Sequence, residues 1–253
     1  MVDYSAYQRL KVERDGEILR ITIDRADRDN LVDGALHTEM SRIWADVRAD
    51  LDAKVIVLRG AGDAWFCNTA DPEWAAAFDA RMYRQVAHEG RWGFGDMAGV
   101  QQPIVAAMNG DACNFGSTLL AMCDIIVAAD HARVWDHHNI LYGIASGDGG
   151  ALAYPLSMGL NRAKAMMLLG EKLPARELVE LGVAYRAVPL AELDATVTAI
   201  AQKLCEQPAE ALWWTKMLLN RPLKDAVTRD LDMGVLAEAY TSLLKPSSEK
   251  RRS

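Results

Sequence analysis

The sequence predicts an α/β fold whose strand-rich first part is followed by a helical C-terminal region. Two observations lead to this prediction. Up to about residue 150, short apolar runs of strand length alternate with helix-like segments, and beyond that point the pattern is mostly helical. We therefore expect residues 1–190 to form one core and residues 191–253 to form a helical region that ends in a polar tail.

The first elements expected along the chain are a hairpin and an amphipathic helix. Asp15 and Gly16 lie between two alternating segments, which is typical of a hairpin turn. Leu36, Met40 and Ile43 recur at helical spacing. The elements predicted here are strands over residues 8–13 and 18–23, a helix over 35–51, a strand over 55–58, a loop over 62–71 and a helical segment over 72–99.

The stretch from residue 103 to residue 150 organises the rest of the chain. Residues 103–108 and 124–129 read as two buried strands, and Asn109 and Gly110 form a turn before a short helix. Free N–H groups and the positive end of the helix dipole point the same way at a helix N-terminus. This turn is therefore a candidate anion or oxyanion site, although an ordinary strand–helix–strand unit explains the same pattern.

The remaining third of the chain is predicted to be helical with one short strand. Gly182 ends one helix and precedes the strand. The predicted elements are helices over residues 161–169, 175–181, 190–205, 208–219 and 224–244, a strand over 183–188, and a polar tail that begins at residue 246.

Composition excludes several classes of function. The chain has 253 residues, of which 51% are hydrophobic and 25% charged, as in ordinary globular proteins. Its net charge of −7 and lack of a basic stripe argue against nucleic acid or an anionic membrane as partners. No apolar run reaches the length of a membrane span, and the first residues lack the order of a signal peptide. We expect a cytoplasmic protein whose four cysteines are reduced thiols.

A few titratable residues are candidates for catalysis. His37 lies in the first turns of its predicted helix, His137 and His138 are adjacent, and Asp148 lies between two glycines. A carboxylate that orients a histidine raises the pKa of the imidazole and fixes its tautomer, which suits a general base. Each residue taken singly is also explained as a structural histidine or a turn aspartate. No His, Cys and carboxylate set has metal-ligand spacing, and no Gly-x-Ser-x-Gly or phosphate-loop motif is present.

Four stretches resemble the crotonase (enoyl-CoA hydratase/isomerase) superfamily, and the resemblance extends over residues 8–244. They are LRGAGDAWFC at residues 58–67 with the NTAD that follows, IVAAMNG at 104–110, AMCDIIVA at 121–128, and LLG at 168–170 with ARELVELGVA at 175–184. The resemblance implies a spiral of ββα units with a C-terminal helical trimerisation region, and a homotrimer or hexamer. It also implies an oxyanion hole made by the backbone N–H groups of Ala70 and Phe115, which would stabilise an enolate or a tetrahedral oxyanion.

Departures from the family pattern point to one branch. The two glutamates of enoyl-CoA hydratases fall at Thr118 and Asn139, and neither residue replaces a carboxylate as an acid or base. The chain resembles the 6-oxocamphor hydrolase (β-diketone hydrolase) branch in three stretches, which are Phe66-Cys67-Asn68, Gly147-Asp148-Gly149 and Gly159-Leu160-Asn161-Arg162.

Functional positions of that branch match His37, Asp148 and Glu238. Its catalytic histidine falls at Asn139 in an ungapped alignment, and at His138 if the loop shifts by one residue. Which of His137, His138 or Asn139 faces Asp148 stays open at this point. In the implied mechanism His138 is held by Asp148 and activates water, and His37 pairs with Glu238 to orient the substrate or return the proton.

The resemblance therefore implies a hydrolase that cleaves a C–C bond of a cyclic β-diketone, with a small-molecule substrate and no cofactor. Trp135, His137 and Asn139 are expected to contact the substrate. Two alternatives remain, a coenzyme A thioester enzyme of the same superfamily with Asp148 as acid and base, and a catalytically inactive binding or assembly subunit. Arg25 and Arg28 are the best candidates for phosphate contacts, but Asp24, Asp27 and Asp29 surround them.

Overall fold

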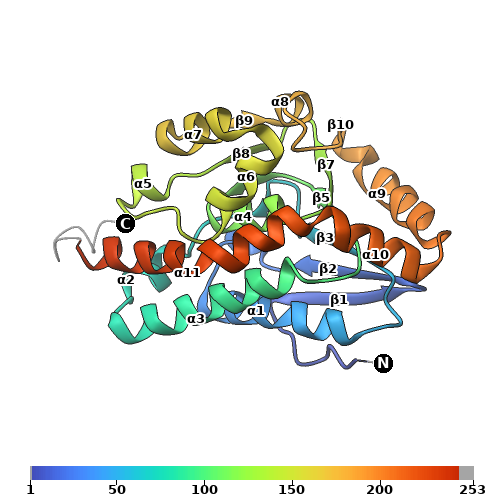
Figure 1. Cartoon of the computed structure of the whole chain (residues 1–253), viewed down its shortest axis with the longest axis horizontal. Helices are drawn as coiled ribbons and strands as arrows, with labels where there is room; N and C mark the ends of the chain where they lie inside the picture. Colours follow the sequence, from blue (N-terminus) through green and yellow to red (C-terminus); the bar gives the residue numbers. More distant parts are fainter. Residues whose placement is uncertain (1, 245–253) are drawn as a thin grey trace.

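A computed structural model describes residues 2–244, and its backbone is organised around a six-stranded sheet (Figure 1). The strand order is β1-β2-β3-β5-β7-β10. Strands β1 and β2 form an antiparallel hairpin, and all other pairs in this sheet are parallel. The hairpin and the apolar strands predicted from the sequence are confirmed. Their bounds are β1 Leu10–Asp15, β2 Ile18–Ile23, β3 Val55–Gly60, β5 Ile104–Met108, β7 Ile125–Ala129 and β10 Arg186–Val188.

A second sheet has four short strands, which alternate along the chain with strands of the first sheet. Its order is β4-β6-β8-β9, and each of β4, β6 and β8 comes directly after a strand of the large sheet and before a helix. This succession is the repeated ββα unit of a crotonase-like spiral. The sequence pattern predicted a loop where β4 lies, because strands of two or three residues are too short to show alternation. The bounds are β4 Trp65–Cys67, β6 Asp111–Cys113, β8 Arg133–Trp135 and β9 Leu173–Pro174.

Some helices lie within the spiral between its strands, and the others form the C-terminal region. The segment predicted as one helix over residues 72–99 is two, because Asp79 caps a new helix by accepting a hydrogen bond from the Met82 amide at 2.8 Å. Helix α6 was not predicted, since its residues are almost all apolar and show no polar face. The bounds are η1 Ala26–Arg28, α1 Gly34–Ala49, α2 Pro72–Ala76, α3 Ala80–Met97, α4 Phe115–Ala121, α5 His138–Leu141, α6 Gly150–Met158, α7 Leu160–Leu169, α8 Ala175–Glu180, α9 Leu190–Cys205, α10 Ala209–Leu219 and α11 Arg221–Leu243.

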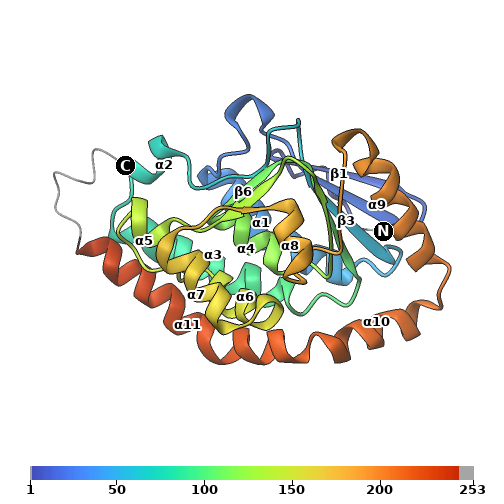
Figure 2. The ribbon, with the colours of Figure 1, turned by 90° about the horizontal axis from the view of Figure 1, so that it is seen from above.

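The C-terminal helices pack back onto the spiral. Helix α9 lies against β3, β5 and β7, and α11 runs beside α3 and α6 (Figures 1 and 2). This return brings the end of α11 to the wall of a cavity that residues of α3, α4 and α5 also line. The polar tail predicted from residue 246 lies outside the described residues.

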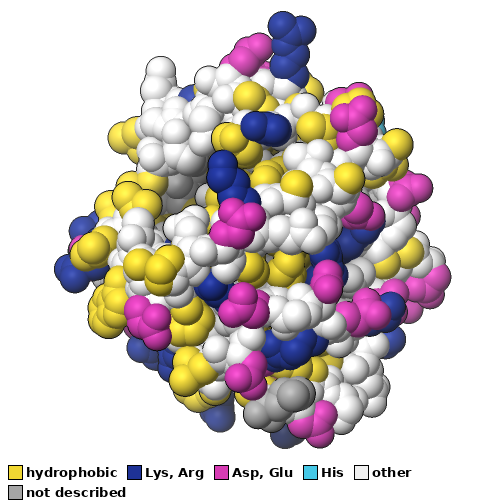
Figure 3. Space-filling model, turned by 90° about the vertical axis from the view of Figure 1, so that its right-hand side faces the viewer, with side chains coloured by type: hydrophobic (Ala, Val, Ile, Leu, Met, Phe, Trp, Pro, Cys, Tyr) yellow, Lys and Arg dark blue, Asp and Glu magenta, His cyan; other side chains and the backbone are white. Residues whose placement is uncertain are grey.

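The surface carries charges of both signs. On the face around α9, α10 and the end of the β1–β2 hairpin, acidic and basic side chains are interspersed (Figure 3). Arg59 and Asp194 form one such pair, with a 2.7 Å distance between Nη1 and Oδ1. Among residues 2–244, no helix has the length and apolar character that a membrane crossing needs.

Candidate active site

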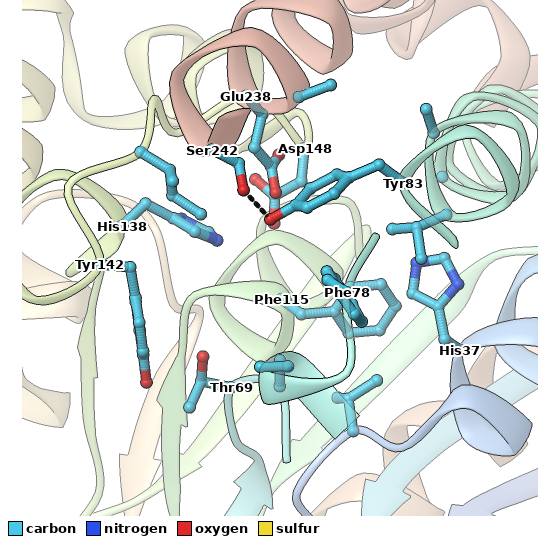
Figure 4. Close-up of a pocket in the computed structure, with 18 of the residues that line it drawn as sticks. His37, Thr69, Phe78, Tyr83, Phe115, His138, Tyr142, Asp148, Glu238 and Ser242 are labelled. Atoms are coloured by element: carbon cyan, nitrogen blue, oxygen red, sulfur yellow. Dashed lines mark hydrogen bonds between the residues drawn. The ribbon is translucent and has the colours of Figure 1, made fainter. Parts of the chain in front are cut away.

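A cavity of about 140 Å³ lies between α2, α3, α4, α5 and α11 (Figure 4). Most of its wall is apolar or aromatic, which favours an apolar ligand. Tyr83 on α3 and Ser242 on α11 join across the cavity through a hydrogen bond between their hydroxyl groups. The aromatic lining residues are Trp74, Phe78, Tyr83, Phe94, Phe115 and Tyr142.

His138 lines this cavity and is held by Asp136, two residues earlier in the chain. The imidazole Nδ1 donates to the Asp136 carboxylate, at 3.0 Å from Oδ2. The same carboxylate accepts from the His138 amide at 3.1 Å and from the Ser146 hydroxyl at 2.7 Å. The prediction that Asp148 holds this histidine is wrong. Sequence reasoning missed Asp136, although the Asp-x-His spacing was a visible signal.

Asp148 also faces the cavity, but its hydrogen-bond partner is Thr118. The Thr118 hydroxyl donates to Oδ1 at 2.9 Å, and Oδ2 is buried without a partner among the described residues. The flanking glycines explain its position. A Cβ on Gly147 would lie 2.0 Å from the Gly234 carbonyl oxygen on α11, and Gly149 has a φ of +117°.

Glu238 on α11 completes a group of four titratable side chains. Figure 4 shows its carboxylate beside that of Asp148, both facing the same space as the His138 ring. One ligand atom from each of Asp136, His138 and Asp148 lies within 4.8 Å of the others. That spacing suits a metal ion, but the hydrogen-bonded Asp136–His138 pair explains it without one.

Burial and mutual charge shift the pKa values of this group. Burial alone would lower the pKa of His138, but the carboxylates of Asp148 and Asp136 outweigh it and raise the pKa to about 10. Burial raises the pKa of Asp148 and, together with the neighbouring carboxylates, raises the pKa of Glu238 to about 7. Burial also disfavours ionised Asp136, but the hydrogen bond from His138 outweighs it and lowers the pKa of Asp136. These shifts favour the imidazolium form of His138 at neutral pH and bring the pKa of Glu238 close to neutrality.

His37 lines another wall of the cavity, and its partner is Glu89 rather than Glu238. Its Nδ1 donates to the Glu89 carboxylate, with 2.7 Å between Nδ1 and Oε2. The predicted His37–Glu238 pair is wrong because α11 places Glu238 on the side of His138. No pattern in the sequence pointed to Glu89, which lies on α3, 52 residues from His37 in the chain.

The two amides expected to form an oxyanion hole both belong to residues of the cavity wall. Ala70 is held in place because the Thr69 carbonyl accepts from the Val32 amide and the Asp71 amide donates to the Val32 carbonyl. Phe115 is the first residue of α4, after Asn114 with a φ of +50°. Neither amide has a hydrogen-bond acceptor among the described residues, so both remain available to a ligand.

Three residues expected to contact substrate lie outside the cavity wall. Trp135 is buried in β8, and its ring contacts Trp65 and the Lys172 ammonium. The His137 ring makes a 3.0 Å hydrogen bond with the Gly170 carbonyl. Asn139 has a buried Oδ1 and is not part of the lining. Of the three adjacent residues His137, His138 and Asn139, only His138 lines the cavity. The alignment that is shifted by one residue is therefore the one that matches the structure.

The arginines considered for phosphate binding are already paired. The Arg25 guanidinium lies 3.3 Å from Asp33 and 3.5 Å from Asp71. Arg28 lies 3.1 Å from Asp71 and 3.6 Å from Glu73. The carboxylates that neutralise these arginines are therefore Asp33, Asp71 and Glu73, and not the sequence neighbours Asp24, Asp27 and Asp29.

Comparison with known proteins gives the family. A sequence model of the enoyl-CoA hydratase/isomerase family matches residues 13–243. The chain belongs to this family, within the crotonase superfamily. A carnitinyl-CoA dehydratase of Escherichia coli is 31% identical to this crotonase over 241 residues, which cover 94% of this chain and 90% of the relative.

Two solved structures are similar to this crotonase over nearly their whole length. One is an enoyl-CoA hydratase/isomerase from Mycobacterium paratuberculosis, with a TM-score of 0.92 and 32% identity over 98% of this chain and 99% of that one. The other is a β-diketone hydrolase from the cyanobacterium Anabaena, bound to (S)-3-oxocyclohexyl acetic acid. It has a TM-score of 0.88 and 27% identity over 94% of this chain and 96% of that one. Both the fold and the superfamily predicted from the sequence are confirmed.

Proposed function

We propose that this protein hydrolyses a C–C bond of a cyclic β-diketone by a retro-Claisen reaction. The observation that carries the proposal is the group of His138, Asp148 and Glu238 in an aromatic cavity whose wall also includes Ala70 and Phe115. The two positions at which enoyl-CoA hydratases have glutamates are Thr118 and Asn139 in this chain, and neither can act as an acid or base. The Thr118 hydroxyl supports Asp148, and Asn139 lies outside the cavity wall.

The first step is the attack of water on one carbonyl carbon. An imidazolium accepts no further proton, so His138 supplies positive charge and the base is a carboxylate. Glu238, whose pKa of about 7 suits a general base at neutral pH, takes one proton from water as the oxygen bonds to the carbonyl carbon. The carbonyl oxygen becomes an oxyanion, and the two amides donate hydrogen bonds to the oxygen on which charge develops.

The second step breaks the C–C bond. The tetrahedral oxyanion collapses to a carboxylic acid, and the bonding electron pair leaves as an enolate of the second carbonyl. A proton from His37 on another wall then bonds to the enolate carbon and gives a ketone. Proton exchange with solvent returns Glu238 and His37 to their starting states, so the net change is the addition of one water molecule.

The charges around the cavity favour a free diketone over a nucleotide-bearing substrate. The cavity wall contains no lysine or arginine among the described residues. Arg25 and Arg28, near the Ala70 loop, are occupied by Asp33, Asp71 and Glu73. Coenzyme A needs cationic partners for its phosphates, and these guanidinium groups would first have to leave their carboxylates.

A coenzyme A thioester enzyme is the second candidate, and the relatives favour it. The carnitinyl-CoA dehydratase and the mycobacterial enoyl-CoA hydratase/isomerase share this fold over nearly the full chain. Asp148, buried and with a raised pKa, would then act as the acid and base in place of the missing glutamates.

Turnover assays separate the candidates. The purified protein is incubated with bicyclic β-diketones and, in parallel, with short enoyl-CoA thioesters. We expect a keto acid that carries one ¹⁸O atom when the reaction runs in H₂¹⁸O, and no hydration of the thioester. Hydration of the thioester without diketone cleavage would contradict the proposal, and no turnover of either class would support the inactive-subunit alternative.

A further inference from the structure

We infer that Glu89 is the positioning residue of His37, and that the two form a second acid–base pair at the cavity wall, where His37 faces the cavity and Glu89 lies behind it, separate from Asp136 and His138. This inference rests on the proposed function for the step in which the pair takes part. The pair itself stands on the geometry of α1 and α3.

The Glu89 carboxylate is fully committed to polar partners around His37. Its Oε2 accepts from His37 Nδ1 at 2.7 Å, and its Oε1 accepts from the Thr38 hydroxyl and the Gln85 amide, each at 2.9 Å. Burial raises the pKa of Glu89, but these hydrogen bonds, with His37 first, outweigh it and hold the pKa below its usual range. The carboxylate is therefore ionised and can only accept hydrogen bonds at neutral pH.

The close approach of α1 and α3 sets this contact. A Cβ on Gly93 would lie 2.8 Å from the Ser41 Cα, so the two helices touch at that point. Gly93 follows Glu89 by four residues, and Ser41 follows His37 by four. Residues four apart lie on the same face of a helix, so the contact that needs glycine also aligns His37 with Glu89.

The hydrogen bond to Glu89 keeps a proton on Nδ1 and leaves Nε2 for the substrate. The His37 ring lies beside Trp74 and Phe115, with centroid distances of 5.5 Å and 5.4 Å. Figure 4 shows one ring nitrogen turned toward the cavity and the other turned away. The Nε2–H of protonated His37 can thus reach the enolate carbon, where a C–H bond forms and the N–H electron pair stays on the ring. The hydrogen bond to Glu89 fixes the ring in the orientation that this transfer needs.

Substitutions at Glu89 test this role. Glu89→Gln keeps the shape and removes the charge, and we expect kcat on the diketone to fall about 10- to 100-fold while KM changes less than about threefold. In Glu89→Ala, kcat should fall further than in Glu89→Gln. Added formate should restore at least part of this kcat, because the Glu89 side chain is 19% exposed and its site is open to a small anion. Asp96→Asn is the matched control, since it removes a hydrogen-bonded carboxylate from the same helix and should leave kcat unchanged.

A second measurement tests the pair without any substrate. In protein labelled with ¹⁵N-histidine, the ring nitrogen shifts of neutral His37 should report Nδ1 as the protonated nitrogen, and Glu89→Gln should move the population toward the other tautomer. Wild-type kcat in both Glu89 variants, no effect of formate, or an unchanged tautomer would overturn the inference. Absence of diketone turnover in the wild type would instead overturn the proposed function, and the tautomer would still decide on the pair.

Discussion

At the scale of single residues, the distribution of protons over Asp136, His138, Asp148 and Glu238 decides the chemistry. One imidazole lies among three carboxylates in a site that excludes much of the solvent. Asp136 stays ionised because His138 donates to it, whereas burial and repulsion favour protonation of Asp148 and Glu238. Different roles for similar groups follow from their surroundings rather than from their residue type.

Asp148→Asn should lower turnover by about two to four decades, because it removes a titratable carboxyl group beside His138 and the reacting water. The fold should survive, since the asparagine Oδ1 can still accept from Thr118. Steady-state kinetics and thermal unfolding measure both effects. Asp194→Asn, at an exposed carboxylate, is the control and should change neither. Unchanged turnover in Asp148→Asn would remove this residue from the mechanism.

Glu238 should make the free energy of unfolding depend on pH. Its pKa rises from 4.5 to about 7 on folding, so its favourable contribution is complete below pH 4.5 and is lost as the pH rises through 7. Urea unfolding of the wild type should show a loss on the order of 3 kcal/mol across this window that Glu238→Gln lacks. Parallel curves for the two proteins would show that the carboxyl group is not perturbed.

Much of the candidate site could be predicted at this scale, but not its pairings. Comparison with the family pattern pointed to His138, Asp148, Glu238 and His37, and the structure places all four in the cavity wall. Both predicted pairings, Asp148 with His138 and Glu238 with His37, were wrong, because a hydrogen-bond partner depends on how the chain packs. Asp136 was close enough in sequence to be found, whereas Glu89 was not.

At the scale of elements, the contact between α1 and α3 positions one wall of the cavity. Their closest approach has no room for a side chain at Gly93. Gly93→Val should force the Ser41 backbone away, lower the free energy of unfolding by about 1–3 kcal/mol and reduce turnover by separating His37 from Glu89. Gly95→Ala is the matched control, because a Cβ there meets open space and alanine favours the helix.

Chemical denaturation and kinetics of both glycine variants decide this point. A Gly93→Val protein with wild-type stability and turnover would show that α1 and α3 can move apart without consequence.

The strands and most helices could be predicted because their patterns are periodic or continuous. Helix α1 has apolar residues at helical spacing, and β5 is entirely buried. Helix α6 was not predicted because an apolar segment without a polar face shows no helical periodicity. Strand β4 was not predicted because it has only three residues. Length and patterning therefore limit what sequence alone can give.

At the scale of the whole molecule, the C-terminal helices leave apolar side chains in solvent. Trp214, Leu218 and Leu219 on α10 and Met233 and Leu236 on α11 are each more than half exposed. Leu212 and Trp213 on α10 instead pack within the protomer. The spacing of apolar residues in the sequence shows that a helix has an apolar face. It does not show whether that face packs within the same protomer or against another one.

We expect this face to be covered in a homotrimer or a dimer of trimers, because large exposed apolar patches mark interfaces. Light scattering at micromolar concentration should give three or six times the protomer mass of 27.9 kDa. A mass equal to one protomer would contradict the expectation.

Binding of coenzyme A thioesters tests the central claim most directly, since it does not depend on knowing the natural diketone. The cavity wall lacks a cationic side chain of lysine or arginine among the described residues, and Arg25 and Arg28 are paired with carboxylates. Isothermal titration calorimetry with acetyl-CoA should therefore give no binding or a Kd above about 1 mM, which is weaker than about 4 kcal/mol. Micromolar binding of an acyl-CoA would contradict the diketone proposal and favour the thioester enzyme.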